Sequence, residues 1–409
     1  MAIDAGGGKA YKEWPNTAFP EDCPDMLYTP AFTAMFLANF CTVSSFGAFY
    51  LFPLFITEHG GDKSDIGLIM GGFALASALC RPWVANMIDR LGRKKSYLIG
   101  CLTMAVMPLF YLTFAGNLAD FYLPLLVVRI VHGIGLAICF TAIFTFVADI
   151  IPPGRLNEGI GIFGASGLIG TAIGPLIGEM VLHRYGFDAF FIAAGLPALA
   201  ALLITLSLAD PYAPREEQPG PGFFTLLGRR KHLAIALLSL LFGFGLAASG
   251  NFVAPLAQAR HLPFVSLYFI AYSTAAVLIR LVGGRLADRV GEARILPYAL
   301  LITASGLLAL IFVTSAPAFF AAGFLAGAGH GLLFPTLNAL AIRDEPARNR
   351  GKITGIFTGG IDTGAFAGAV ILGYLGEWGG LELIFAVGGT ALLSGLVLAR
   401  PYPRRPNAT

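Results

Sequence analysis

The stretch that decides the fold is Arg81-Pro-Trp-Val-Ala-Asn-Met-Ile-Asp89-Arg90-Leu91-Gly92-Arg93-Lys94-Lys95. An apolar segment that contains an arginine ends here in a basic turn. About two hundred residues later the chain repeats the pattern, since Arg280 precedes Asp288-Arg289-Val290-Gly291 by the same interval. Two such turns at equivalent places predict a duplicated unit.

Composition places this unit in a lipid bilayer. The 409 residues are 56% hydrophobic and 12% charged, with a mean hydropathy of +0.74, whereas roughly a quarter of the residues of a soluble domain carry charge. The 51 glycines fit helices that approach closely in lipid. The five cysteines have no metal-ligand spacing and are interpreted as small buried apolar residues. We expect no metal, no cofactor and no enzyme, because no catalytic constellation stands out.

Apolar stretches of about 20 residues, the length that crosses ~30 Å of hydrocarbon, occur twelve times. They do not alternate as barrel strands do, so the sequence predicts an all-α membrane protein. The predicted spans are 31–56, 65–88, 96–115, 121–149, 158–182, 187–209, 232–257, 263–287, 295–315, 319–342, 352–375 and 382–399.

The longest polar interruption, residues 210–231, divides the spans into six and six. We therefore predict a cytoplasmic tail at 1–28, a six-helix bundle at 29–209, a cytoplasmic linker at 210–231, a second bundle at 232–400 and a cytoplasmic tail at 401–409.

The basic residues predict the orientation. Of the 27 lysines and arginines, only Lys63, Arg184 and Arg260 fall in loops on the side away from the linker. By the positive-inside rule the basic loops and both termini face the cytoplasm, which predicts a multi-pass protein of the plasma (inner) membrane. Binding of nucleic acid is the rival interpretation of basic clusters, but these occupy every second loop, as topology requires.

Two six-helix halves joined by a central loop, with a repeated Asp-Arg-x-Gly turn, resemble the major facilitator superfamily over essentially the whole chain after Leu27. The first turn is similar to motif A of that family at Asp89, Arg90, Gly92, Arg93 and Lys94. It departs at Ala85, where the family has glycine. The second copy keeps Asp288 and Arg289 but has Gly291-Glu292-Ala293 in place of Gly-Arg-Lys. The resemblance implies two pseudo-symmetric bundles around a central cavity.

Two further motifs are similar to those of one branch. Arg129, His132 and Gly133 in the fourth span resemble motif B, and the fifth span has Gly170, Gly174, Pro175 and Gly178 as in motif C, with Glu179 at its final glycine. The resemblance to motif C implies a proton antiporter of the drug-exporting branch.

The glycines of the fifth span lie four residues apart and form a smooth face. The plain interpretation is close helix packing, and the family implies that this face packs on the eighth span and closes one side of the transport pathway.

Asp89 ends the second span and Asp149 ends the fourth, and both are expected near Arg90 and Arg93 of the first turn. This arrangement predicts a charge cluster that locks one conformation. The alternative is that the basic residues serve only positive-inside topology. The first copy is expected to form the stronger lock.

Charged residues inside spans are the sharpest functional signal, because charge within the membrane is costly. The third, sixth, ninth and twelfth spans have none in their interiors, as the family implies for lipid-facing helices. Counting residues from the turns puts His330 level with Asp362, and Arg129 level with Glu179. We hypothesise that His330 and Asp362 form a proton site, with a static hydrogen-bonded pair as the alternative, and that Arg129 and Glu179 form a structural or gating ion pair.

Several other polar residues are candidates for the substrate cavity. His132 is interpreted first as a core histidine. Polar side chains also join helices to each other, so the cavity roles stay open. The proposed cavity group is Arg129, His132, Asn39, Asn251, Asn338 and Arg280.

The sequence thus predicts a monomeric secondary transporter that exports small amphipathic molecules in exchange for protons. The alternative is a proton symporter that imports a small organic acid, with Arg129 or Arg280 binding the carboxylate. The partners are a small-molecule substrate, protons and the lipid bilayer, and no nucleic acid.

Overall fold

The computed structural model describes residues 26–152, 155–210, 221–343 and 345–399, without the side chains of 156–157, 281–289 and 347–348. Most of both predicted tails lies outside these ranges. Within them, all regular secondary structure is helical, as predicted. The first half contains α1 (Pro30–Ala48), η1 (Phe49–Leu51), α2 (Phe52–Glu58), α3 (Lys63–Leu91), α4 (Arg93–Phe110), η2 (Tyr111–Thr113), α5 (Leu118–Ile150) and α6 (Leu156–Leu206). The second half contains α8 (Arg230–Ala259), α9 (Ser266–Val290), α10 (Glu292–Ala309), η4 (Leu310–Phe312), α11 (Ala316–Ile342) and α12 (Ala347–Ala399), and α7 (Phe223–Leu227) precedes it.

These elements supply the twelve predicted spans. Nine helices or joined helices are long and apolar enough to cross a membrane in the described part of the chain, and α9 adds a shorter apolar helix at Ser266–Arg280. Two of the nine, α6 and α12, contain two spans each. At 51 residues, a straight α6 would be about 77 Å long, more than twice the thickness of the hydrocarbon layer.

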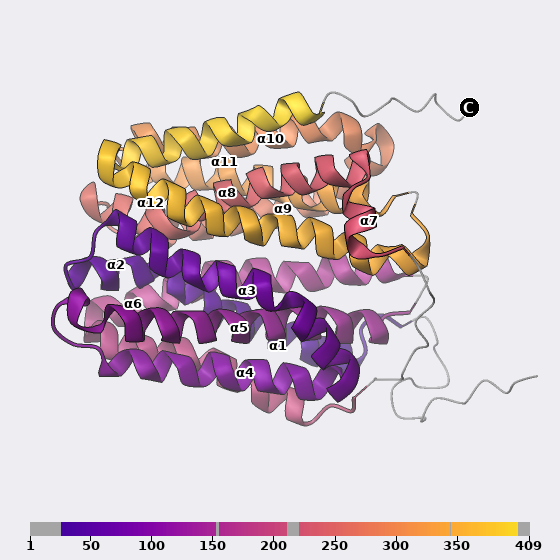
Figure 1. The fold of residues 1–409 in the computed structure, drawn as a ribbon, viewed down its shortest axis with the longest axis horizontal. Coiled ribbons are helices and arrows are strands. Elements are labelled where there is room, and N and C mark those ends of the chain that lie inside the picture. Colours follow the sequence, from indigo (N-terminus) through magenta and orange to yellow (C-terminus); the bar gives the residue numbers. More distant parts are fainter. Residues whose placement is uncertain (1–25, 153–154, 211–220, 344, 400–409) are drawn as a thin grey trace, which may run out of the picture.

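Glycine reverses the chain inside both long helices. Gly186 has φ 79° and Gly380 has φ 80°, values that L-residues with a side chain rarely adopt. Figure 1 shows α12 turning back on itself at its orange-to-yellow end. The two reversals occupy equivalent places in the two halves, as duplication predicts.

Helix starts are set by local capping. Asp62 accepts a hydrogen bond from the backbone of Asp65, whose side chain accepts one from the backbone of Asp62, so α3 begins with a capping box. Thr29 caps α1 and Asn117 caps α5 in the same manner, each through one side-chain oxygen.

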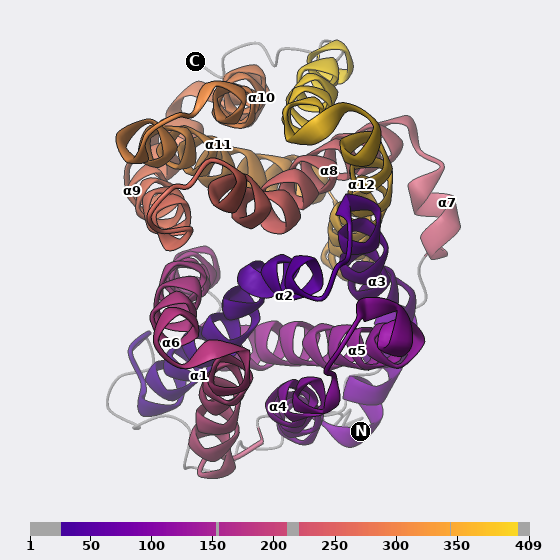
Figure 2. The same cartoon turned by 90° about the vertical axis from the view of Figure 1, so that its left-hand side faces the viewer.

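The helices form two bundles that lie side by side (Figure 2). In each bundle the helices run roughly along one axis, and α7 (Phe223–Leu227) lies at one end of the bundles (Figure 1). We call this the linker end and the opposite end the distal end. The halves meet along two crossings, α3 with α12 and α6 with α9. In Figure 2, α4 and α10 lie at the outer margin, as the uncharged third and ninth spans predict.

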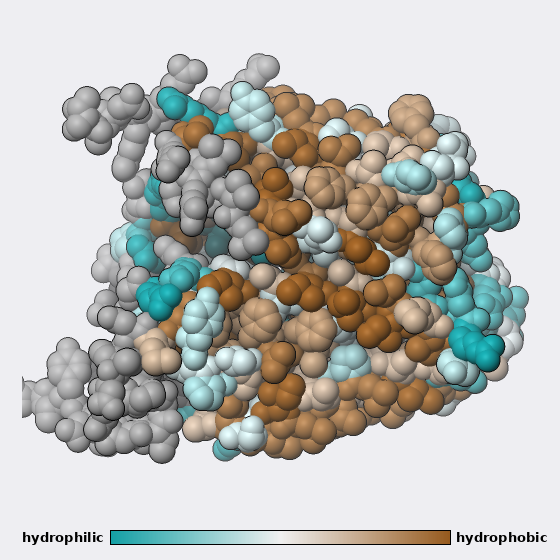
Figure 3. Space-filling view, turned by 180° about the vertical axis from the view of Figure 1, so that it is seen from behind, coloured by the Kyte–Doolittle hydropathy of each residue, from teal (hydrophilic) through white to brown (hydrophobic). Residues whose placement is uncertain are grey.

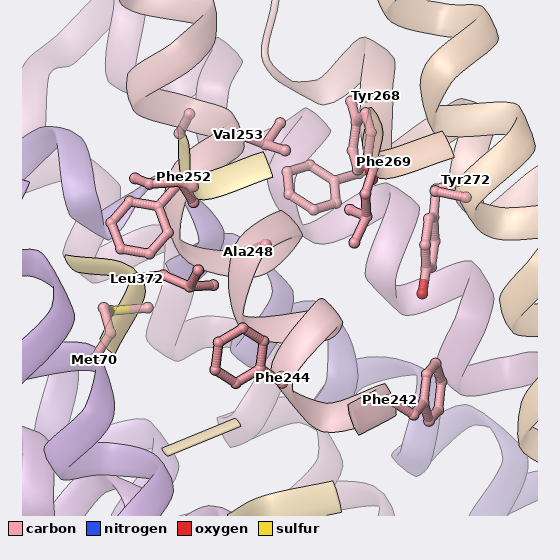
Figure 4. Packing of buried hydrophobic residues seen from close by; sticks show 14 of the residues in the cluster. Met70, Phe242, Phe244, Ala248, Phe252, Val253, Tyr268, Phe269, Tyr272 and Leu372 are labelled. Atoms are coloured by element: carbon pink, nitrogen blue, oxygen red, sulfur yellow. The ribbon is translucent and has the colours of Figure 1, made fainter. Parts of the chain in front are cut away.

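The halves share one hydrophobic core at the distal end. Its members from the first half, such as Phe52, Ile66 and Met70, pack in one cluster with Phe252 and Leu372 of the second half. Figure 4 draws part of this cluster. First-half residues nearer the linker end form a separate cluster. The structure is therefore closed at the distal end.

The outer surface is apolar across the middle of the molecule. Figure 3 shows a broad hydrophobic region with hydrophilic residues gathered toward the two ends. Large exposed side chains such as Leu123, Phe312 and Trp378 contribute to the apolar surface of the chain. This distribution suits a protein whose sides contact lipid.

Candidate functional site

An ion pair between the halves marks the first part of the site. Arg81 of α3 donates from Nε to Oδ2 of Asp362 on α12. Both side chains are partly buried, with exposed fractions of 28% and 20%. The predicted contact between Asp362 and His330 is wrong, because the carboxylate of Asp362 pairs with Arg81.

His330 instead belongs to an aromatic cluster within the second half. Its Nδ1 shares a hydrogen bond with the hydroxyl of Tyr272, and its ring stacks on Phe334 at 5.9 Å between centroids. Phe242 meets the same ring edge-on at 5.1 Å. Figure 4 shows the Tyr272 side chain near Phe242. Counting residues from the turn predicted the depth of His330 but not the direction in which it points.

Arg129 is enclosed by the first half. It is 1% exposed, and its guanidinium carbon lies 4.4 Å from the ring centre of Phe73, 4.7 Å from Phe52 and 5.5 Å from Phe49. Its Nη2 donates to the sulfur of Met70 at 3.2 Å. These rings stabilise the cation through their negative faces.

The predicted Arg129–Glu179 ion pair is wrong as well. The Glu179 carboxylate, 3% exposed, accepts hydrogen bonds from the backbone N–H of Val265 at 2.7 Å and of Ser266 at 2.8 Å. These are the first amides of α9, where the helix dipole favours an anion. Glu179 thus joins the halves at the distal end.

The glycine face of α6 packs on α1 rather than on the eighth span. A Cβ at Gly174 would lie 2.2 Å from the carbonyl oxygen of Ser44, and one at Gly170 would lie 2.8 Å from that of Phe40. Pro175 lies beside Gly47 of α1, and Gly178 faces Phe190 and Leu51. The structure therefore corrects the predicted partner of this face, and the plain interpretation, close helix packing, describes the contact.

The remaining cavity candidates have separate surroundings. His132 is 1% exposed, contacts the Tyr111 hydroxyl at 3.2 Å and fits the predicted core histidine. Asn39 donates to Ser166 at 2.8 Å and keeps a buried, unpartnered carbonyl oxygen. Asn338 also has a buried oxygen without a partner, and Asn251 is partly buried on α8.

The first motif turn forms the predicted charge cluster. Gly92, at φ 89°, ends α3 and starts α4. Arg93 then pairs with Asp149 at 3.0 Å and with Asp89 at 3.6 Å. Arg90 is exposed in the last turn of α3.

The second motif turn also forms an ion pair, with the positions of the acid and the base exchanged relative to the first turn. Gly291 has φ 88°, and the next residue, Glu292, pairs with Arg343 at the end of α11. This pair was not predicted, although the acid at 292 and the base at 343 occupy the places of Arg93 and Asp149 with the charges exchanged. The side chains of Asp288 and Arg289 lie outside the described part of the chain.

A family model described as Major Facilitator Superfamily matches residues 34–270 and, in a second match, residues 235–409. The chain belongs to this superfamily. It is thus an integral, multi-pass membrane transporter and not an enzyme, with a small-molecule substrate and the lipid bilayer as partners. Over the described residues, no group of three or more His, Cys, Asp or Glu side chains could hold a metal ion.

Relatives of the chain include multidrug resistance proteins. The chain is 27% identical over 341 residues to an uncharacterized MFS-type transporter of Methanocaldococcus jannaschii, covering 78% of this chain and 83% of that protein. It is 26% identical over 377 residues to the multidrug resistance protein MdtG of Serratia proteamaculans, covering 88% and 89% of the two chains.

Solved structures of the superfamily share the fold. The nucleoside transporter NupG matches with a TM-score of 0.75 at 13% identity, over 90% of this chain and 98% of that one. The human organic anion transporter MFSD10 matches with a TM-score of 0.68 at 18% identity, over 91% and 99%. At these identities the likeness concerns the arrangement of the helices.

Proposed function

We propose that this transporter exports small amphipathic molecules in exchange for protons by alternating access. The observation that carries the proposal is the Arg81–Asp362 ion pair, which joins the two halves inside the membrane. Asp362 lies about 23 Å from the start of α12 and about 27 Å from Gly380, at ~1.5 Å per residue. Ionisable residues at this depth are costly, so they are rare and tend to mark ion pathways, proton relays or substrate sites.

Protonation of Asp362 would couple this pair to movement of the halves. An ionised Asp362 holds Arg81 and so holds α3 against α12, whereas a neutral Asp362 loses most of that attraction. A proton that binds one conformation better than the other shifts the balance between them. Asp362 is therefore our candidate proton carrier, with Arg81 as its counter-charge; His330 is a secondary candidate inside its own aromatic cluster.

Opening and closing would occur at opposite ends in alternation, as rocking of two repeats around a midplane site. Glu179 bonded to α9 closes the distal end, and the charge clusters of the two motif turns act at the linker end. Arg129 supports the first half from inside, while Asn39, Asn251 and Asn338 are candidates for the cavity lining.

The proposed direction of transport is supported by the relatives and by the charge distribution. Exchange in the outward direction is supported by the multidrug resistance proteins among the relatives. By the positive-inside rule, the basic loops support a cytoplasmic location of the linker end and of both termini, with the protein in the plasma (inner) membrane. On this assignment the distal end faces outward, and the protein works as a monomer.

The test uses purified protein in lipid vesicles with an imposed pH jump and a fluorescent amphipathic dye. Asp362→Asn should reduce pH-driven dye exchange by about tenfold or more, because it removes the charge that shifts the two-state balance. The exposed Asp188 provides the control variant Asp188→Asn, which should exchange at the wild-type rate. The double variant Arg81→Gln/Asp362→Asn removes both charges and guards against a folding defect from an unpaired arginine.

Two outcomes would overturn the proposal. Unchanged pH-driven exchange in a folded Asp362→Asn protein would exclude Asp362 as the proton carrier. Dye that moves in the same direction as protons in the wild type would replace antiport with the symport alternative.

A further inference from the structure

Arg280 is the duplicated counterpart of Arg81, yet its surroundings differ. Each arginine precedes the glycine of its motif turn, Gly92 or Gly291, by the same number of residues. Each lies on the second span of its half, and that span crosses to the fifth span of the other half. Arg81 meets Asp362 at its crossing. Arg280 meets Gly164 of α6, with Nη1 3.1 Å from the position of a Cβ on that glycine.

No acid among the described residues pairs with Arg280. Its Nε is buried without a hydrogen-bond partner, and its guanidinium carbon lies 5.5 Å from the ring centre of Phe334. On the facing helix, Gly161 lies one turn from Gly164, and a Cβ there would meet nothing within 4 Å. The guanidinium therefore lies between the ring of Phe334 and the part of α6 that carries Gly161 and Gly164.

Arg129 shows what a sealed arginine looks like in the same protein. Phe49, Phe52 and Phe73 surround its guanidinium, and the side chain is 1% exposed. A ligand would have to displace these rings to reach it. Arg81 is neutralised by Asp362, and Arg129 is enclosed by aromatic rings. Arg280 lies at the interface of the halves without a counter-charge among the described residues.

We propose that Arg280 binds the anionic group of the transported molecule, so that the substrates are amphipathic anions such as aromatic carboxylates or sulfonates. The substrate anion would occupy the place that the Asp362 carboxylate occupies beside Arg81. Guanidinium matches carboxylate and sulfonate geometry with paired hydrogen bonds. The apolar part of the substrate would lie on Phe334 and on the His330–Tyr272 cluster that adjoins it.

This assignment rests on the proposed transport of amphipathic molecules but is tested without a proton gradient. Binding of 1-naphthoate and of 1-naphthylmethylammonium, which have the same ring system and opposite charges, is measured calorimetrically on the purified full-length protein. The wild type should bind naphthoate and not the ammonium compound. Arg280→Gln should weaken naphthoate binding about 10- to 100-fold, the range expected for loss of a charged hydrogen-bonded partner.

A second variant keeps Arg280 and removes the site in another way. Gly164→Asp places a carboxylate opposite the guanidinium and reproduces the pairing of Arg81, so naphthoate binding should be lost to the same extent. The control is Arg260→Gln, because Arg260 is paired with Glu382 at the distal end, away from the site. It should leave naphthoate binding unchanged.

Wild-type protein that does not bind naphthoate, or that binds only the ammonium compound, would overturn the anion site. So would full naphthoate binding in either Arg280→Gln or Gly164→Asp. None of these results affects the proton-coupling proposal, which depends on Asp362 and on pH-driven exchange. Loss of pH-driven exchange in the wild type would in turn leave the binding result intact.

Discussion

The two crossings between the halves use the same architecture for different purposes. At the α3–α12 crossing, Arg81 finds an internal partner in Asp362. At the α6–α9 crossing, the equivalent Arg280 faces Gly164 and has no acid partner in the described residues. Duplication supplied two equivalent cations, and divergence of the facing helix gave one of them a titratable partner. On our proposals, this difference would divide proton handling and substrate binding between two equivalent positions.

The distal contacts of the two crossings also differ in kind. The α3–α12 crossing brings backbone against backbone, since a Cβ on Gly67 would lie 2.5 Å from the carbonyl oxygen of Ala369. The α6–α9 crossing is closed by a buried carboxylate, Glu179, on two backbone amides. The α3–α12 contact combines this close backbone packing with an ion pair between the partly exposed Lys63 and the exposed Glu377, whereas the α6–α9 contact depends on a buried carboxylate.

Removing the charge of Glu179 should give the largest change at the distal end. Glu179→Gln keeps the shape but opposes one amide hydrogen with a side-chain NH₂ group. Charged hydrogen bonds contribute about 1.5–3 kcal/mol, so the closed population should fall about 10- to 100-fold relative to the open one. Spin-label distances between positions 58 and 258, both exposed near the distal end, measure that population.

The matched control for this change is His183→Gln, on the next turn of α6, which leaves the two amide contacts in place. A distance distribution in Glu179→Gln equal to that of the wild type would show that the carboxylate does not hold the distal end closed.

Adding one methyl group at each crossing should have a smaller effect than Glu179→Gln, and the effect should differ between the two crossings. Gly67→Ala drives a Cβ into rigid backbone, and one added methyl group is expected in the lower part of the about 1–3 kcal/mol that overpacking costs. The closed population should fall about 5- to 30-fold. Gly164→Ala meets only the end of the flexible Arg280 side chain and should stay near the wild type in the same spin-label measurement. Equal effects of the two variants would contradict the distinction drawn between the crossings.

Exchanging the two charges of the first motif turn is expected to have the smallest effect on stability. Arg93 begins α4 and Asp149 lies in the last turn of α5, so both charges oppose the helix dipoles, whereas Glu292 and Arg343 agree with them. The double variant Arg93→Glu/Asp149→Arg copies the second half. Its gain from the dipoles, about 0.3–1 kcal/mol per charge, is partly offset by repulsion from Asp89.

We therefore expect the double variant to melt within a few degrees of the wild type in detergent and well above the single variant Arg93→Glu. The single variant places three acids together and serves as the comparison. A double variant that melts as low as the single one would show that the pair is held by contacts other than its charges.

Much of the architecture could be predicted because membrane insertion constrains the sequence directly. Spans 158–182 and 187–209 were separated correctly, because length limits a span and glycine permits the reversal at Gly186. The Arg93–Asp149 cluster was predicted because both residues lie at turns, where sequence position and position in space agree closely.

The site was predicted less well, for a geometric reason. Counting residues along a helix gives depth, but contact also requires that two side chains point toward each other. His330 and Asp362 were assigned to one depth, yet one points to Tyr272 and the other to Arg81. Glu179 was paired with the wrong partner because its partners are backbone amides at the start of a helix. Such amides carry no charged side chain that the sequence could reveal.

The sequence by itself determined the membrane class, the twelve spans, the duplication and the residues that carry charge into the bilayer, because hydrophobic length and charge cost act on each segment separately. Only the tertiary structure decided which charge meets which partner. Partner choice depends on how helices rotate and pack against each other, and that rotation is set by contacts between distant segments, such as Gly174 on α1 and Gly67 on α12.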